Sequence, residues 1–395
     1  MILWLIFLVR EQVGWKVPTA FTYTSTRMML AAISSLLFSI SLGPWFIRKL
    51  QEFNIGQAIR SEECPPLEQL HGKKRNTPTM GGGLIIAAMI FSLLLWTDLH
   101  QIFTWILLVT TIFLGLLGGW DDILKVKYRN SKGLSAKKKL LGQLVLSSCL
   151  TCYLFIPAVQ HSISDSMKIV APQVRDGSTI LSVADYAARI YLPFFKEPIL
   201  TLSSAALILG GLFSFLVIAG SSNAVNLTDG LDGLATGCLI MVAACLATIA
   251  FLSNNVDIAA YLNILYISGS GEIAVYLSAF IGACLGFLWY NAPPAQLFMG
   301  DIGSLTLGGI VGISALLLKR ELLLVIIGGV FVAEALSVIL QVASYKLRNK
   351  KRLFLCAPLH HHFELMGCPE TKVVVRFWIA ALLLAILGMI SIKFQ

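Results

Sequence analysis

The stretch QIFTWILLVTTIFLGLLGGWDD (101–122) decides the fold class of this chain. Its first twenty residues carry no charge, and it then ends in two adjacent aspartates, Asp121 and Asp122. An α-helix needs about 20 mostly apolar residues to cross the hydrocarbon core of a membrane. The stretch therefore predicts a membrane-spanning helix that ends at the membrane surface with a pair of carboxylates.

Nine further apolar segments extend this pattern. Of the 395 residues, 57% are hydrophobic and only 13% are charged, unlike an ordinary soluble domain. Lipid admits only helices and closed barrels, and barrel strands would be shorter and alternating. We therefore predict an all-α polytopic membrane protein. The ten expected spans lie near 27–47, 81–97, 101–120, 140–158, 199–219, 233–252, 273–290, 302–318, 322–342 and 374–393.

The N-terminal segment 1–26 is also apolar at its start, but it contains Arg10 and Glu11 and lacks a small-residue cleavage site. We interpret it as an interfacial or partly inserted segment rather than a removed signal peptide. The chain shows no Pro/Gly/Ser linker, low-complexity tract or internal repeat. Residues 1–395 are therefore expected to form one integral membrane domain.

The net charge of +9 is unevenly distributed. Three predicted loops, 48–80, 121–140 and 343–376, hold 20 of the 30 Lys and Arg residues. The positive-inside rule makes this face cytoplasmic and leaves both termini and the long polar loop 159–198 outside. Nucleic acid is not an expected partner, because the basic clusters are short loops between membrane helices.

Five aspartates end apolar segments on the predicted cytoplasmic face, and they are Asp121, Asp122, Asp229, Asp232 and Asp301. Ionisable groups at membrane depth are costly and commonly functional. Together with nearby histidines and lysines, they predict one cytoplasm-facing site that binds a divalent metal and phosphates.

The paired aspartates repel each other at a low-dielectric boundary unless a cation neutralises them. Lys125 lies four residues after Asp121 and three after Asp122, so it can pair with either on a continuing helix. A role as base or metal ligands is favoured over a topological stop signal, because stop signals are normally basic.

The segment NAVNLTDGLDGLA (223–235) places Asp229 and Asp232 at i, i+3, which predicts one helical face. Gly230 permits close approach of a ligand, and Asn226 adds hydrogen-bonding groups. The alternating oxygen ligands and distal Glu of a calcium loop are missing, so an EF-hand is excluded. A capped helix start with Asp229 as the N-cap remains an alternative.

The segment NAPPAQLFMGDIGS (291–304) places Asp301 at a predicted helix N-terminus after a proline pair. An N-cap is the alternative here as well. A helix N-terminus also suits phosphate oxygens, and Asp301 can bridge them through Mg²⁺.

The segment APLHHHFELMG (357–367) carries His360, His361 and His362, which cannot all face one way on a helix. Binding of zinc together with Cys356 and Cys368 is disfavoured, because the spacing does not match a zinc finger. Phosphate binding or proton transfer beside the aspartates fits better.

Two further basic segments predict contacts with anions. The loop HGKKRNTPTMGG (71–82) brings lysines next to a Gly-rich backbone without a Walker A spacing, which indicates phosphate contacts. Lys137–Lys139 can reach an anionic substrate or lipid headgroups.

In this order, TPTMGG, GGWDD, NLTDGLDGLA, FMGDIGS and PLHHHFE resemble the polyprenyl-phosphate N-acetylhexosamine-1-phosphate transferase superfamily. The resemblance extends from about Arg27 to the C-terminus. PLHHHFE (358–364) is the more specific motif and is similar to the phospho-N-acetylmuramoyl-pentapeptide-transferase branch.

This resemblance implies transfer of phospho-MurNAc-pentapeptide from UDP-MurNAc-pentapeptide to undecaprenyl phosphate, giving lipid I and UMP with Mg²⁺. It also implies a homodimer among the lipids of the bacterial cytoplasmic (inner) membrane.

The resemblance assigns roles by matched position. Asp301 matches the metal-binding aspartate, His360 the catalytic histidine, and Asp121 and Asp122 the pair that includes the proposed base, with Asp121 preferred. The implied substrate-binding residues are Lys74, Lys125, Lys139, Asn226, Asp229, Gly230, Asp232, Asn291, Phe298, His361 and His362. One departure is Asn76, where the family has Gly before TPTMGG.

Phosphoryl transfer depends mostly on positioning and charge neutralisation. We expect direct attack by the lipid phosphate, and a covalent phospho-aspartate route remains open. A secondary transporter is the alternative from another class, but transporters carry their carboxylates near the midplane. An intramembrane aspartyl protease is disfavoured because Gly-x-Gly-Asp is absent. Within the enzyme class, a GlcNAc-1-phosphate transferase is the alternative.

Overall fold

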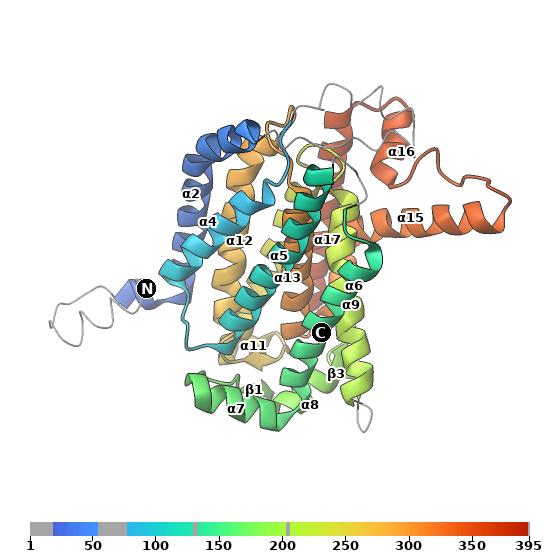
Figure 1. The fold of residues 1–395 in the computed structure, drawn as a ribbon. Coiled ribbons are helices and arrows are strands. Elements are labelled where there is room, and N and C mark those ends of the chain that lie inside the picture. The colour runs from blue at the N-terminus through green and yellow to red at the C-terminus, as the bar shows by residue number, and fades with distance from the viewer. Residues whose placement is uncertain (1–18, 54–76, 129–132, 203–205, 394–395) are drawn as a thin grey trace.

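A computed structural model describes residues 19–53, 77–128, 133–202 and 206–393 as a helical bundle (Figure 1). The helices are a 3-10 helix, η2 (Thr19–Thr22), and the α-helices α2 (Thr24–Glu52), α4 (Gly82–Trp96), α5 (Ile102–Tyr128), α6 (Ala136–Phe155), α7 (Pro157–Met167), α8 (Val183–Ala188), α9 (Ala206–Thr228), α10 (Leu234–Ser253), α11 (Val256–Tyr261), α12 (Ser270–Asn291), α13 (Gly300–Leu317), α14 (Glu321–Ile327), α15 (Gly329–Leu347), α16 (Leu359–Leu365) and α17 (Glu370–Lys393). The strands are β1 (Val174–Asp176), β2 (Thr179–Leu181), β3 (Arg189–Tyr191), β4 (Pro198–Thr201) and β5 (Tyr266–Ile267).

Eight helices of the described ranges are long and apolar enough to span a membrane, namely α2, α5, α9, α10, α12, α13, α15 and α17. The pair α6 and α7, bent by 92°, makes a ninth if it is counted as one span. The chain is thus a multi-pass α-helical membrane protein, as predicted. Every predicted span contains a helix. The predicted number of ten spans is nevertheless larger than the eight or nine that the described helices provide. The apolar helix α4 has only 15 residues, and α6 begins among three lysines.

Helix α13 forms the centre of the bundle. Its sequence GDIGSLTLGGIVGISALL is rich in small residues, and it packs against α5, α9, α4 and α10. Small residues let membrane helices approach closely, which is the main source of their packing energy in lipid. Because α13 begins at Gly300, its position fixes that of Asp301.

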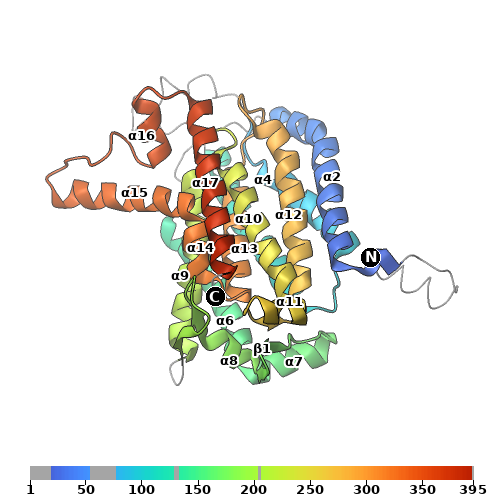
Figure 2. The same cartoon turned by 180° about the vertical axis from the view of Figure 1, so that it is seen from behind.

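The predicted continuous span 322–342 is wrong, because the helix breaks at Gly328 into α14 and α15. Gly328 and Gly329 are adjacent residues of low helix propensity, so the chain can turn here at little cost. Helix α15 projects away from the bundle in both views (Figures 1 and 2). Its first turns stay inside, with Val330, Phe331 and Glu334 buried.

The predicted loop 159–198 is structured rather than an open loop. Strand β1 pairs antiparallel with β2 and with β5, and β3 pairs with β4. These strands, α7 and α8 lie at the end of the bundle opposite the start of α13 (Figure 1). The half of the molecule that holds them also contains the start of α2 and the end of α17. Which membrane face this is stays a prediction.

Most of the predicted interfacial segment 1–26 lies outside the described residues, as do Lys74 and Asn76.

Candidate active site

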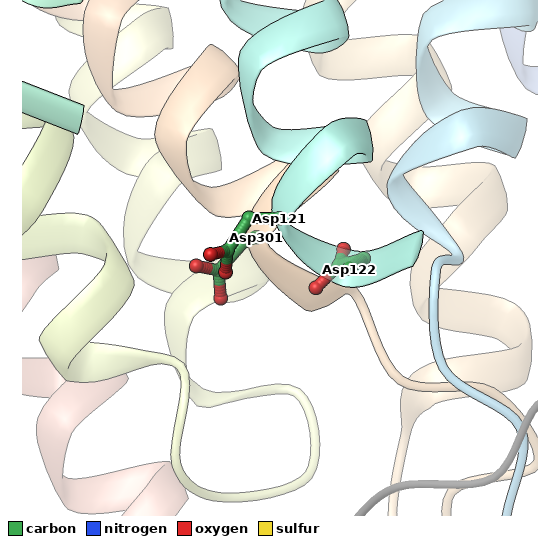
Figure 3. A group of neighbouring side chains, drawn as sticks. All are labelled: Asp121, Asp122 and Asp301. Carbon is green, nitrogen blue, oxygen red and sulfur yellow. The ribbon is translucent and has the colours of Figure 1, made fainter. Parts of the chain in front are cut away.

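Helices α5 and α13 cross closely where the aspartates lie. A Cβ atom on Gly118 would sit 2.3 Å from the backbone oxygen of Asp301, so only glycine permits this approach. The glycines before the paired aspartates therefore bring both of them to Asp301. One oxygen each of Asp121, Asp122 and Asp301 lies within 4.8 Å of the others (Figure 3). Within the described residues, this is the one group of His, Cys, Asp and Glu side chains arranged to hold a metal ion, and the zinc alternative gains no support.

The TPTMGG motif braces this crossing through its backbone. The Gly81 N–H donates to the Phe298 oxygen and the Gly82 N–H to the Met299 oxygen, both at 2.7 Å. In return, the Phe298 N–H donates to the Pro78 oxygen at 2.9 Å. The motif thus fixes the segment that leads into Asp301, which is a structural role beside the expected contact with phosphate.

Two lysines bridge the same two carboxylates. Lys125 Nζ lies 2.6 Å from Asp121 Oδ2, 2.8 Å from Asp301 Oδ1 and 3.7 Å from Asp122 Oδ1. Lys139 Nζ lies 2.9 Å from Asp121 Oδ2 and 2.5 Å from Asp301 Oδ2. Three carboxylates thus face two ammonium groups, which leaves one formal negative charge. The lysine side chains are 21% and 16% exposed, so the cluster can be reached from solvent.

A buried polar network aims Lys139 at the cluster. Gln143, one turn later on α6, donates to Ser222 Oγ at 3.1 Å and accepts from the Asn223 amide at 3.0 Å. Ser222 Oγ in turn donates to the Leu305 backbone oxygen at 2.8 Å. These bonds join α6, α9 and α13, so α6 cannot rotate about its axis without breaking them.

The paired aspartates also accept backbone hydrogen bonds. Asp122 Oδ2 accepts from the Ile302 N–H at 2.9 Å, in the first turn of α13. Asp121 Oδ1 accepts from the Leu134 N–H at 2.5 Å. The N-cap alternative for Asp301 is wrong, because Met299 holds that position and Asp301 faces the lysines.

The residues 229–233 form a turn between α9 and α10, so the predicted single helical face for Asp229 and Asp232 is wrong. The N-cap of α10 is Gly233, with φ +76°, and not Asp229. Burial, followed by the charges of Asp301, Asp122 and Asp232, raises the pKa of Asp229 to about 7. This turn therefore carries a carboxylate that titrates near neutral pH.

Asn291 and Asp232 connect this turn to the segment 292–298. Asn291 Oδ1 accepts from the Gly233 N–H at 3.0 Å, and Asn291 Nδ2 donates to the Leu297 oxygen at 2.8 Å. Asp232 Oδ2 accepts from the Ala295 N–H at 2.9 Å. In the structure both side chains thus organise backbone. Phe298 is half-buried beside them, and Asn226 lies near the end of α9.

The three histidines point in different directions, as their spacing predicts. His361 Nδ1 contacts Glu364 Oε2 at 2.8 Å, and His362 Nδ1 accepts from the Leu355 N–H at 3.2 Å. The His360 ring is buried against Gly230, where a Cβ atom would lie 2.3 Å from Nε2. Of the three, His360 is the one that the fold brings to the 229–233 turn.

Comparisons with known proteins identify a family and relatives of this chain. The family model for Glycosyl transferase family 4 matches residues 104–319, more than half of the chain. A phospho-N-acetylmuramoyl-pentapeptide-transferase of Protochlamydia amoebophila (strain UWE25) is 62% identical over 395 residues, 96% of each chain. Relatives with the same name from Desulfatibacillum aliphaticivorans and Francisella philomiragia are each 45% identical, over 95% and 94% of both chains.

The chain belongs to the phospho-N-acetylmuramoyl-pentapeptide-transferase family. The recognition from the five motifs is thereby confirmed.

For a member of this transferase family, two carboxylates near the motifs escaped the sequence reasoning. Glu334 of α15 contacts His360, and Glu370 at the start of α17 accepts from the Asp232 N–H at 3.1 Å. The signal for Glu334 was present, because it is an isolated acid within the apolar run GVFVAEALSVIL (329–340). Glu370 lies before the last apolar segment, among polar residues of the sequence, and carries no comparable signal.

The aspartate cluster suits the metal that this transferase family implies. Carboxylate oxygens are the ligands that hard divalent cations such as Mg²⁺ prefer. The ammonium groups of Lys125 and Lys139 form ion pairs with Asp121 and Asp301. The cluster thus already binds positive charge. The secondary-transporter alternative loses support, because these side chains lie in the last two turns of α5 and the first turns of α6 and α13, and not midway along a span.

Proposed function

We propose that this chain transfers phospho-MurNAc-pentapeptide from UDP-MurNAc-pentapeptide to undecaprenyl phosphate, forming lipid I and releasing UMP. This is the first membrane step of peptidoglycan synthesis. The observation that carries the proposal is the cluster of three aspartates and two lysines at helix ends, in a chain 62% identical to a named transferase. A membrane enzyme of this kind transfers a phospho-sugar from a nucleotide to a lipid phosphate, and both substrates are anions.

In the proposed mechanism, charge neutralisation and alignment do most of the work. A phosphate oxygen of the lipid forms a bond to the sugar-bound phosphorus of the UDP-sugar, and the bond from that phosphorus to UMP breaks. Lys125 and Lys139 lie where they can contact the phosphates and stabilise the charge on the departing UMP. When the lipid phosphate is protonated, Asp121 or Asp122 accepts its proton.

Magnesium is the proposed metal, with Asp301 as its principal ligand and Asp121 and Asp122 beside it. When bound, the ion neutralises charge on the phosphate oxygens and aligns them. Asp301 would hold the ion together with whichever of Asp121 and Asp122 does not act as the base, and the lysines would remain for the substrates.

The proposed nucleotide end of the site comprises the 229–233 turn and the segment that leads to Phe298. Asn226, Asp229, Gly230, Asp232 and Asn291 belong to it, through direct contacts or by holding backbone. Lys74, His361 and His362 are proposed to bind substrate, and His360 is the proposed catalytic histidine. The protein is proposed to act as a homodimer in the bacterial inner membrane, with the site facing the cytoplasm.

The deciding experiment measures UMP release by the purified full chain in detergent with Mg²⁺ and undecaprenyl phosphate. Either UDP-MurNAc-pentapeptide or UDP-GlcNAc is the donor, and Asp301→Asn is the inactive control. Lipid-dependent release from the muramoyl donor alone supports the proposal. Release from UDP-GlcNAc instead moves the protein to the sister activity, and release from neither donor overturns the proposal.

A further inference from the structure

A buried carboxylate on α15 faces the histidine that reaches the site. Glu334 and His360 are both fully buried, although they come from different helices. Glu334 Oε1 accepts from the His360 backbone N–H at 3.2 Å, and Oε2 lies 3.2 Å from His360 Nδ1. The same side chain therefore holds both the first turn of α16 and the imidazole ring.

The burial makes this pairing energetically necessary. An ionised carboxylate without a counter-charge or hydrogen bonds is costly in a low-dielectric interior. Within the described ranges, Glu334 has its ion-pair contact with the His360 ring. The Oε2 and Nδ1 atoms lie close without the alignment of a full hydrogen bond. A small rotation of the ring would complete the bond.

The far side of the ring faces the 229–233 turn, which belongs to the proposed nucleotide end of the site. His360 Nε2 is buried, has no hydrogen-bond partner and lies against Gly230. Any side chain on Gly230 would collide with it, so the close approach requires glycine there. The unsatisfied nitrogen is thus aimed at the turn that also carries Asp229.

The partner at one ring nitrogen controls the chemistry of the other. A carboxylate beside Nδ1 favours a proton there, so Nε2 presents a lone pair in the neutral ring. The same carboxylate also stabilises the imidazolium when Nε2 takes up a proton. Glu334 therefore suits a histidine that exchanges a proton or contacts a phosphate through Nε2.

The break at Gly328 explains how Glu334 reaches this place. Helix α15 turns away from α14 there, and its first part packs against α9, α16 and α17. Glu334 lies in the second turn of α15, on this packed part, while later residues such as Ile339 are exposed. The break in the span thus places the Glu334 carboxylate on a part of α15 that is packed against other helices.

We infer that Glu334 is a positioning residue that fixes the orientation and the tautomer of His360 in the transfer reaction. The inference rests on the proposed function and adds a residue to it. Glu334 touches no substrate in this view and acts through the imidazole.

Glu334→Gln tests the inference most directly. Its amide oxygen can still accept from the His360 N–H, but its NH₂ group opposes a proton on Nδ1 and favours the reversed tautomer. We expect kcat to fall roughly 10- to 100-fold, as for other partners that orient a functional histidine, with KM for the nucleotide sugar changed by no more than about twofold. Glu334→Asp keeps the charge and should recover part of the loss.

The double variant separates positioning from general damage. In a His360→Gln background, adding Glu334→Gln should change kcat by less than about twofold, because the ring to be oriented is gone. Glu321→Gln is the matched structural control. Glu321 is a buried carboxylate on the other half of the same broken span, and it pairs with Lys319 Nζ at 2.6 Å. It should lower the thermal unfolding midpoint and leave kcat unchanged.

Equal losses of kcat in the native and His360→Gln backgrounds would overturn the inference, as would an unchanged kcat in folded Glu334→Gln. If Glu334→Gln does not fold, Glu334→Asp is compared in both backgrounds by the same criterion. Wild-type protein that releases no UMP overturns the proposed function before any variant is compared, so the two failures are distinguishable.

Discussion

The two ends of the bundle hold buried charges in opposite ways. At the end with the strands, Arg27 and Glu272 form a one-to-one pair at 2.7 Å, with side chains 9% and 5% exposed. Glu272 also accepts a hydrogen bond from the Asp98 N–H at 2.8 Å. Its charge is therefore balanced by Arg27, and the pair is shielded from solvent. At the other end, three aspartates face only two lysines, and both lysines remain partly exposed.

This contrast separates stability from function. A balanced, sealed ion pair has its charges satisfied by the protein itself, and breaking it leaves a costly buried charge. A cluster with surplus carboxylate and access to solvent is still open to another cation. Perturbed and imbalanced charges of this kind are typical of functional sites. Substitutions at the two ends should therefore have opposite effects on stability and activity.

The largest expected effect is on activity at the aspartate end. Asp301→Asn removes the carboxylate that contacts both lysines, and kcat should fall about 10²- to 10³-fold, as when one preorganised electrostatic group is lost. The unfolding midpoint should stay unchanged or rise, because two carboxylates then face two ammonium groups. UMP release and thermal unfolding of the same preparation test both statements. A lowered midpoint together with lost activity would contradict the contrast.

At the other end the effect should be on stability. Arg27→Met leaves Glu272 buried without its counter-charge, and the free energy of unfolding should fall by about 3–5 kcal/mol. Adding Glu272→Gln should recover part of this loss, because the uncompensated charge is gone. The kcat of the folded fraction should match that of the wild type. Denaturant titration in detergent, with activity measured per folded molecule, provides the test.

The sequence predicts that the site residues lie on one face of the membrane. It does not predict which side chains contact each other there. Apolar runs that end in aspartates on one face require those aspartates to share a membrane surface, and the structure places Asp121, Asp122 and Asp301 together. Which oxygen faces which lysine depends on helix rotation. That rotation is set by contacts such as Gln143 to Ser222, between residues far apart in sequence.

The two largest errors of prediction share a physical cause in glycine. Gly328 and Gly329 sit inside an apolar run, and such pairs are tolerated in straight membrane helices as well as at breaks. The sequence therefore could not distinguish one span from α14 and α15. In DGLDG, the i, i+3 spacing favours a helix, but α9 ends at Thr228 and α10 begins only after Gly233, whose φ is +76°. Glu334 stands inside an apolar run and outside the five motifs, so no motif points to it.

The pH dependence of stability should also differ between the ends. The pKa of Asp229 is raised to about 7 by burial and then by neighbouring carboxylates, so the folded protein binds this proton more tightly than the unfolded chain. Its contribution to stability is therefore fully present only below the unfolded pKa of 3.8 and is lost as the pH rises from there through 7. Burial lowers the pKa of Arg320 at the other end to about 10, so that residue stays charged throughout.

Asp229→Asn should therefore stabilise the metal-free protein at pH 8, and by less at pH 5, which lies between the unfolded and folded pKa values. Asp229 is partly exposed, so the gain should be on the order of 2 kcal/mol rather than the full value of the shift. Unfolding midpoints of both proteins in a chelator, measured from pH 5 to pH 8, provide the comparison. A difference that does not grow with pH would show that the turn is not titrating.

The smallest effect should be on metal affinity. It tests whether the surplus carboxylate charge of the cluster binds a divalent cation. Lys139 Nζ bridges Asp121 and Asp301, the same carboxylates that a divalent cation would take. The ammonium group must move before an ion can bind both, so Lys139→Met should raise the affinity for Mn²⁺ about tenfold, equivalent to roughly 1.4 kcal/mol. Calorimetric titration without substrate measures this directly.

Lys137→Met is the matched control, because Lys137 has the same charge on the same helix but is exposed. If both variants raise the metal affinity equally, the effect is long-range attraction and not competition. If Lys139→Met alone raises it while weakening the binding of UDP-sugar, the lysine occupies the metal position only until the ion arrives and then becomes free for the phosphates. The charges of Arg27 and Glu272 are already matched one to one, whereas the aspartate cluster has one carboxylate more than it has lysines, and this is the physical difference between the two ends.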